Sequence, residues 1–306
     1  MVYWFRYWKS GRSVIENAND APVVFVQRME GVTTLNPSRN GVRSDELPRQ
    51  LVVQKGFYCF GNAVYDCTIS GVYRFVDPQK TNCQHIVLDE DPIGNALLVS
   101  FLCLRGNRDS DYMQQQLEKF SVNRFLSLTC GPACIFAESL LNAQGYRSRV
   151  VYSHTIGELN SYNNGHVLLE VFSTSLCQYV AVDMDKKCLF RVNGKLSSLY
   201  EYSKALFEDE EIAIDFFSQT TTIDYMGFVE RASNFSYDFI EHAVYSEKAG
   251  LTDYLARICQ VPMMMDDDKT FVCAWDEVNE SRLREINSDW QILDRQNFFD
   301  MFYSQQ

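Results

Sequence analysis

The chain of 306 residues is 46% apolar and 22% charged, a composition that excludes a disordered or collagen-like protein and suits one large or two modest globular domains. Its 28 basic and 40 acidic residues leave a net charge of −12. Because such a chain repels phosphate backbones, this balance argues against nucleic acid as a partner.

The sequence carries no recognisable targeting or membrane-spanning segment. Arg6 and Lys9 interrupt the aromatic residues at the N-terminus, which is untypical of the apolar region of a signal peptide. The longest apolar run covers 96–104, about half of what a membrane helix needs. We therefore expect a soluble, cytoplasmic protein with no membrane partner, whose oligomeric state the sequence does not indicate.

The ten cysteines are scattered through apolar segments without a Cys-x-x-Cys pair, and the chain has only four histidines. In a long chain without an export signal, this pattern predicts reduced and mostly buried thiols. It does not predict a structural zinc site, and we expect neither a metal nor a cofactor.

Residues 1–107 are expected to form a β-rich N-terminal portion. Short apolar clusters, rich in β-branched and aromatic residues, are separated by turn-forming pairs such as Asp77-Pro78 and Asp91-Pro92, a pattern that predicts strands. The clusters are at 23–26, 51–53, 57–60, 72–76, 86–88 and 97–104.

In residues 108–195 the spacing of apolar residues changes from that of strands to that of helices, and strands return toward the end. A first helix is predicted over 111–120, with cap candidates at 107–110. A second is predicted over 131–143, because Pro132 suits a first helical turn and Gly145 suits the position just past a helix end. Three strands are predicted after it, with a polar loop at 155–165 between the first two. Their ranges are 147–153, 166–172 and 179–183.

Residues 196–306 are expected to be mainly helical. Apolar periodicity predicts helices over the ranges 198–207, 235–245, 252–259 and, in pieces, 280–303. The segment 263–269, with three methionines followed by three aspartates, is expected as a solvent-exposed loop. It lacks the glycine and glutamate of a calcium-binding loop.

The chemistry points to the start of the second helix. Cys130 precedes Gly131-Pro132 there, and the unpaired N–H groups and dipole of a helix N-terminus favour a thiolate. A thiolate nucleophile needs an imidazole, and the imidazole needs an orienting acceptor. His166 opens one predicted strand and Asp183 ends the next, so adjacent antiparallel strands would bring both side chains to one end of a sheet.

These segments resemble the transglutaminase-like cysteine enzymes. In that family a cysteine opens a helix that ends at a glycine, and an arginine opens the next strand, which correspond here to Cys130, Gly145 and Arg149. Residues 165–172 resemble the family's histidine strand and 179–183 its aspartate strand. The resemblance covers roughly residues 110 to 190, under a third of the chain.

The resemblance implies an α+β fold with a transglutaminase-like core, in which the nucleophile helix packs on an antiparallel sheet. It also implies a triad of Cys130, His166 and Asp183. The sequence departs from the family at several positions. Ala133 and Cys134 stand where the family often has an aromatic residue and an alanine, and in the aspartate strand Tyr179 replaces a tryptophan and Met184 a proline.

Several residues have more than one interpretation. Asp185 is the alternative third member of the triad, and Cys134 is either a core residue or a resolving thiol one turn from Cys130. Glu170 and Arg149 are read as structural or surface residues. For the oxyanion, the backbone N–H of Cys130 is the default donor and Asn123 a side-chain candidate.

The predicted reaction is acyl chemistry through an acyl-enzyme, most plausibly the hydrolysis of a peptide or isopeptide amide by a cysteine protease or amidase. The substrate would be a peptide, a protein or a small amide or thioester. One alternative is acyl transfer to an amine, as in transglutaminases or arylamine N-acetyltransferases, although the Arg-Gly-Gly that precedes the cysteine in the latter is absent from 126–129. The other alternative is a non-catalytic binding module on the same scaffold.

Overall fold

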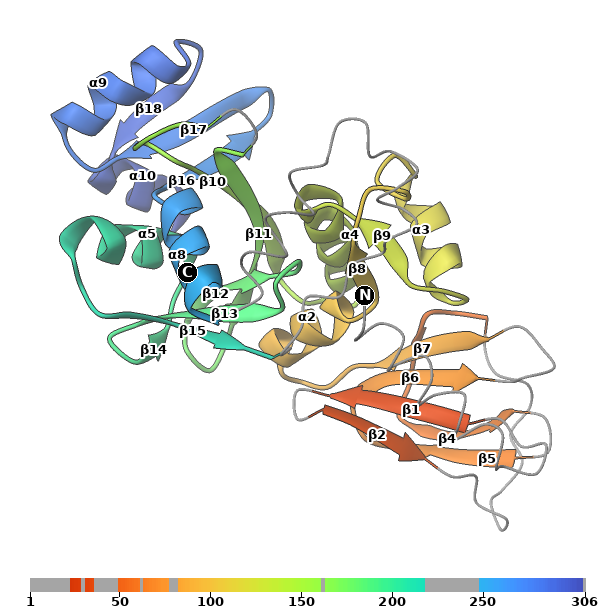
Figure 1. Cartoon of the computed structure of the whole chain (residues 1–306). Helices are drawn as coiled ribbons and strands as arrows, with labels where there is room; N and C mark the ends of the chain where they lie inside the picture. The colour runs from red at the N-terminus through yellow and green to blue at the C-terminus, as the bar shows by residue number, and fades with distance from the viewer. Residues whose placement is uncertain are drawn as a thin grey trace.

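The computed structural model describes residues 23–28, 31–35, 49–60, 63–76, 82–160, 163–217 and 248–304. Within these ranges the protein is α+β, with seven helices, a five-stranded sheet, a nine-stranded sheet and two small two-stranded sheets. Figure 1 shows the five-stranded sheet in red and orange at one end of the molecule and the nine-stranded sheet in green and blue at the other. The predicted helix at 235–245 lies outside the described residues.

The N-terminal sheet has the strand order β2-β1-β6-β7-β3. Its central strands, β1 (Val23–Arg28), β6 (Gly71–Val76) and β7 (Cys83–Val87), pair antiparallel, with β2 (Gly31–Leu35) beside β1. β3 (Val52–Val53) pairs with β7 in parallel. A separate hairpin joins β4 (Gly56–Phe60) to β5 (Ala63–Cys67). The β-rich prediction for this portion therefore holds for most of the predicted strands.

The prediction of a strand over 97–104 was wrong. Residues Pro92–Ser100 form helix α2, and only Cys103–Arg105 form a strand, β8. The start of α2 follows from local chemistry, because Asp91 accepts the N–H groups of Ile93 and Gly94 and Pro92 occupies the first helical turn. Most of its residues are buried, so the sequence shows no amphipathic period and reads as a buried strand.

Two further helices lead to the site. α3 (Gln114–Ser121) begins three residues later than the sequence predicts, because Asp109 and Ser110 bond to the strand that follows α3 instead of capping it. That strand, β9 (Leu126–Leu128), pairs in parallel with β8. α4 (Cys130–Ala143) then begins at the predicted cysteine, and Gly145 follows its end with a positive φ of 86°.

The large sheet has the order β14-β13-β12-β11-β10-β16-β17-β18, with β15 also paired to β13. The three predicted strands are present as β10 (Ser148–His154), β11 (Gly165–Ser173) and β12 (Gln178–Asp183), and they pair antiparallel. β13 (Cys188–Val192) follows β12 through a tight turn and pairs with β14 (Lys195–Leu196).

Helices cover both faces of this sheet. Because successive side chains of a strand point to opposite faces, Leu169 and Val171 pack in one core with α2 and α4, whereas Leu168 packs in a second core. The second core includes α5 (Leu199–Glu208), α8 (Lys248–Ile258) and α10 (Arg295–Phe302). α4 lies directly on β10 and β11, so the expected packing of this helix on an antiparallel sheet is present.

The described part of the C-terminal portion contains four strands that the sequence did not predict, besides its helices. β15 (Ile212–Phe216) pairs with β13, and β16 (Val261–Asp266) pairs with β10, so this portion continues the sheet of the preceding one. β17 (Lys269–Ala274) and β18 (Gln291–Asp294) extend that sheet, beside α9 (Glu277–Ile286). The methionine and aspartate segment is a β-hairpin, in which Met263 and Met264 are buried and Asp267 takes a left-handed turn conformation.

Candidate active site

Cys130 is the first residue of α4, and several bonds fix its approach. The N–H of Gly106, after β8, donates to the carbonyl of Leu128 at 3.1 Å. The N–H of Thr129 donates to the hydroxyl of Ser110 at 3.2 Å. These bonds hold the backbone of Leu128 and Thr129, the two residues before the helix begins. Cys130 itself is partly exposed.

His166 and Asp183 lie on adjacent strands and are in direct contact. Leu169 pairs with Val182 in the register of β11 and β12, which places Asp183 on the same face as His166, two positions along the strand. Diagonal neighbours of this kind are within reach of long side chains. The Nε2–H of His166 donates to Oδ2 of Asp183 at 2.8 Å, and both side chains are buried.

The second oxygen of Asp183 fixes the carboxylate in place. Its Oδ1 accepts the backbone N–H groups of Asp185 and Lys186, each at 2.9 Å. The turn closes with a bond from the Lys187 N–H to the Asp183 carbonyl at 2.8 Å. Asp183 is therefore the carboxylate that faces the imidazole, and its orientation is set by the turn that joins β12 to β13.

The electrostatics of Cys130 and His166 are coupled. Burial alone would raise the pKa of Cys130, but the hydrogen bond and charge of His166, assisted by Arg105, lower that pKa to about 7. Burial alone would lower the pKa of His166, but the Asp183 carboxylate and the thiolate raise it to about 10. A thiolate paired with an imidazolium is therefore the favoured state between these two values. Since Asp183 occupies Nε2, Nδ1 is the ring nitrogen left for the thiol.

Asp185, the alternative third member, has different partners. Its carboxylate pairs with Arg105 at 3.5 Å and with the ammonium group of Lys186 at 3.1 Å. Both Asp185 and Lys186 are buried. Sequence analysis did not single out Arg105 or Lys186, because nothing in a single sequence indicates that β8 lies beside this turn.

Helix α8 packs over the imidazole. The ring of Tyr254 lies edge-on to His166, with 6.5 Å between the ring centroids, and its hydroxyl accepts the side-chain amide of Asn163 at 2.6 Å. Arg257 donates to the Asn163 carbonyl at 3.0 Å. The polar segment before β11 is therefore docked onto α8. Tyr254, like Arg105 and Lys186, is a residue near the site that the sequence did not indicate.

The N-terminus of α4 is the available source of backbone donors for an oxyanion. No side chain in the described part of the chain caps this end of α4, and Pro132 has no N–H. The N–H groups of Cys130 and Gly131 therefore remain for a negatively charged oxygen. Asn123 is not placed for this role: it is exposed, and its amide donates at 3.4 Å to the Lys119 carbonyl of its own turn.

Burial raises the pKa of seven other cysteines: Cys67, Cys83, Cys103, Cys134, Cys188, Cys259 and Cys273. All ten are free thiols. Cys134 is fully buried, and burial followed by the charge of Cys130 raises its pKa well above the ordinary value. Its thiol donates to the Val167 carbonyl at 3.5 Å, which accounts for it as a core residue between α4 and β11.

Arg149 and Glu170 form a structural network away from the triad. The guanidinium of Arg149 donates to Oε2 of Glu170 at 2.9 and 2.6 Å and to the Phe302 carbonyl at 2.6 Å. Oε1 of the fully buried Glu170 accepts the N–H of Leu199 at 2.8 Å and the hydroxyl of Tyr303 at 2.9 Å. The two residues therefore tie the central strands to the start of α5 and the end of α10.

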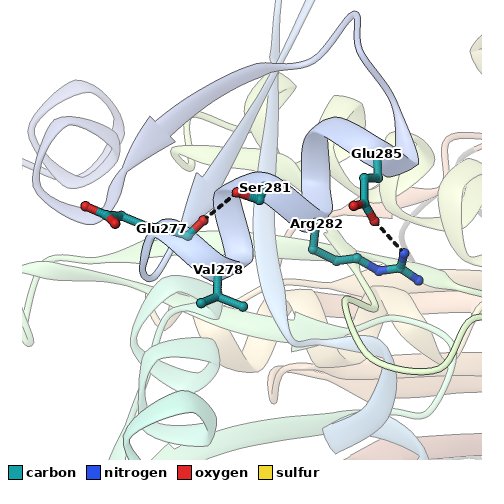
Figure 2. A pocket seen from close by; sticks show the side chains of 5 residues that line it. All are labelled: Glu277, Val278, Ser281, Arg282 and Glu285. Atoms are coloured by element: carbon teal, nitrogen blue, oxygen red, sulfur yellow. Dashed lines mark hydrogen bonds and ion pairs between the residues drawn. The ribbon is translucent and has the colours of Figure 1, made fainter.

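A hollow of about 490 Å³ lies beside α9, away from the triad. Figure 2 shows the five side chains that line it, Glu277, Val278, Ser281, Arg282 and Glu285. Its polar groups bond to one another, since the Ser281 hydroxyl donates to the Glu277 carbonyl and Arg282 pairs with Glu285. It has no thiol or imidazole, so the chemistry favours Cys130 as the candidate site.

Among the described residues, no group of three or more His, Cys, Asp or Glu side chains is arranged to hold a metal ion. No helix in the ranges that the structure describes is long and apolar enough to cross a membrane. Comparison with known proteins gives no family model, no curated protein and no solved structure that matches this chain.

Proposed function

We propose that the protein is a cysteine enzyme that works through an acyl-enzyme, with the triad Cys130, His166 and Asp183, and that its reaction is the hydrolysis of a peptide or isopeptide amide. The observation that carries the proposal is the buried imidazole of His166, which is held 2.8 Å from the Asp183 carboxylate and lowers the pKa of the Cys130 thiol at the start of α4. Nucleophile, base and orienting group are the three parts that thiol catalysis needs.

The proposed steps need only these residues and water. The Cys130 thiolate attacks the carbonyl carbon, and the oxyanion is held by the N–H groups at the start of α4. The C–N bond breaks as the leaving amine takes a proton from His166, which leaves a thioester on Cys130. Neutral His166 then removes a proton from water, the hydroxide attacks the thioester, and the carboxylic acid leaves as the thiolate re-forms. Asp183 holds the imidazole in orientation throughout.

The transglutaminase-like interpretation is part of the proposal. It is supported by α4, which begins with Cys130 and lies on the antiparallel strands β10 and β11, and by the positions of His166 and Asp183 on β11 and β12. The fully formed contact between His166 and Asp183 favours an enzyme over a non-catalytic scaffold, because a binding module needs no such pair.

Acylation of the protein by an activated ester tests the proposal. We expect p-nitrophenyl acetate to add one acetyl group, which intact-protein mass and peptide mapping would assign to Cys130. The adduct should be absent from Cys130→Ala and present in Cys177→Ala, the matched control at an exposed cysteine. An adduct that decays at the same rate with and without an added amine supports hydrolysis, whereas faster decay with the amine supports acyl transfer. No adduct on Cys130 would refute the proposal.

A further inference from the structure

A buried ion pair lies beside the candidate triad without belonging to it. Arg105 ends β8 and pairs in register with Leu128 of β9, two residues before Cys130. Its guanidinium lies 3.5 Å from the carboxylate of Asp185, and the two side chains are only 12% and 3% exposed. An ion pair this sheltered is screened little by solvent or salt.

The ion pair joins the two halves of the site. Asp185 lies in the same turn as Asp183 and donates its backbone N–H to that carboxylate at 2.9 Å. Arg105 belongs to the strand pair that leads into α4. The contacts therefore run from the strand pair before Cys130, through Arg105, Asp185 and Asp183, to His166. The charge of His166 in turn lowers the pKa of the Cys130 thiol.

We propose that Arg105 is a positioning residue for the Cys130 nucleophile, whose positive charge favours the thiolate, and that Asp185 holds the guanidinium and moderates its charge. This inference rests on the proposed function, because it concerns the reactivity of the same thiol. The charged groups around Cys130 act in both directions: Arg105 and His166 favour the thiolate, and Asp185 opposes it. Burial raises the pKa of Cys134 on α4 and of Tyr152 on β10, and the charge of Cys130 raises both further, so these two groups are neutral.

Two lysines, Lys186 and Lys187, also lie in the turn that contains Asp185, and their partners differ from those of Arg105. Lys186 also pairs with Asp185, at 3.1 Å, and Lys186 lies over the ring of Tyr254, on the side of α8. The neighbouring Lys187 is buried, and its ammonium donates to the Cys103 carbonyl at 3.3 Å. Arg105, on the strand pair that leads into Cys130, lowers the pKa of that thiol, whereas Lys186 lies over the Tyr254 ring and Lys187 bonds to the Cys103 carbonyl.

The pH dependence of Cys130 alkylation tests the inference. With iodoacetamide as the probe and peptide mapping as the readout, we expect Arg105→Gln to move the midpoint of Cys130 labelling upward by ~1 pH unit. We expect Asp185→Asn to move it downward, and Arg105→Lys, which keeps the charge, to stay near the midpoint of the unmodified protein. Arg108→Gln is the control, because it removes the same charge from a neighbouring loop residue whose guanidinium lies 3.5 Å from Asp109.

The outcomes separate the inference from the proposed function. If Cys130 of the unmodified protein shows no enhanced labelling below pH 7, the proposed function fails. If that labelling is enhanced but neither Arg105→Gln nor Asp185→Asn moves the midpoint, only the role of Arg105 is refuted. A thermal melt checks the fold of each variant. If Arg105→Gln does not fold, the Asp185→Asn variant tests the inference by itself. A pH midpoint of Cys130 labelling that is unchanged or higher in Asp185→Asn would then overturn it.

Discussion

The carboxylate of Asp183 binds His166 with one oxygen and the backbone of its own turn with the other. The Nε2–H of His166 is thereby held 2.8 Å from Oδ2, while the chain between β12 and β13 keeps Oδ2 from rotating away. A side chain fixed at both oxygens is pre-organised for one partner, so the tautomer and the orientation of the imidazole are set before any substrate arrives.

Replacing Asp183 by Asn tests this arrangement. An amide keeps the oxygen that caps the turn but can favour the wrong imidazole tautomer, so we expect turnover to fall by about 10⁴-fold with little change in substrate binding, as in serine-enzyme triads. The measurement is the rate of Cys130 acylation by p-nitrophenyl acetate. A larger loss in Asp185→Asn than in Asp183→Asn would show that the wrong carboxylate has been chosen.

Replacing Cys130 by Ala should abolish turnover and leave the fold intact. The thiol is partly exposed at a helix start, so its removal is expected to change the free energy of unfolding by no more than about 1 kcal/mol. Urea denaturation measures that change, and Cys177→Ala is the control for loss of a thiol. Undiminished activity of Cys130→Ala on any substrate would end the assignment of the nucleophile.

The elements that carry the candidate triad are those that local signals predict best. Pro132 and Gly145 mark the two ends of α4, and alternation marks β11 and β12. Adjacent strands then bring His166 to Asp183 without any long-range information.

The positions of Arg105 and Tyr254 beside the site could not be predicted, because both residues belong to segments that are distant in the sequence. Arg105 reaches the site through a parallel strand pair, and Tyr254 through the docking of α8. α2 was misread because a helix that is buried all round has no apolar period. The C-terminal strands were missed because β16 and β17 are short and the run of aspartates that joins them resembles a loop.

The variant Glu170→Ala is expected to lower the stability of the protein without changing the reactivity of Cys130. The carboxylate is fully buried and holds Arg149, Tyr303 and the N–H of Leu199. Removing it leaves the Arg149 charge without its partner, which should destabilise the protein by about 3 kcal/mol. Because this network does not touch the triad, the pH midpoint of Cys130 alkylation in the folded variant should stay unchanged. A shifted midpoint would mean that Glu170 belongs to the site.

The pH dependence of stability tests the charge on His166. Its pKa is raised from 6.5 to about 10, against the effect of burial, first by Asp183. A raised pKa contributes stability that is complete below the unfolded value and is lost as the pH rises through the folded value. To remove the opposing titration of the thiol, Cys130→Ala is compared with the Cys130→Ala, His166→Gln double variant in urea.

The gap in unfolding free energy between these two variants should narrow as the pH rises from 6.5 toward 10. Without the thiolate the folded pKa of His166 is expected to be lower, so the narrowing should be complete below pH 10. A folded pKa below 6.5 would change the stability only at lower pH. A gap that stays constant over this range would therefore mean that His166 is held neutral in the folded protein, and the ion pair with Asp183 would then be absent.

The rate of iodoacetamide alkylation of each cysteine in the native protein, measured by peptide mapping from about pH 5 to about pH 9, tests whether Cys130 is an activated nucleophile. With a pKa of about 7, about a tenth of Cys130 is thiolate at pH 6, so it should react far faster there than the buried thiols and faster than the exposed Cys177. In His166→Ala the midpoint should move to higher pH. If Cys130 reacts no faster than Cys177 below pH 7, both in the native protein and in dilute urea that opens the site, the thiolate does not exist and the protein is not a cysteine enzyme of this kind.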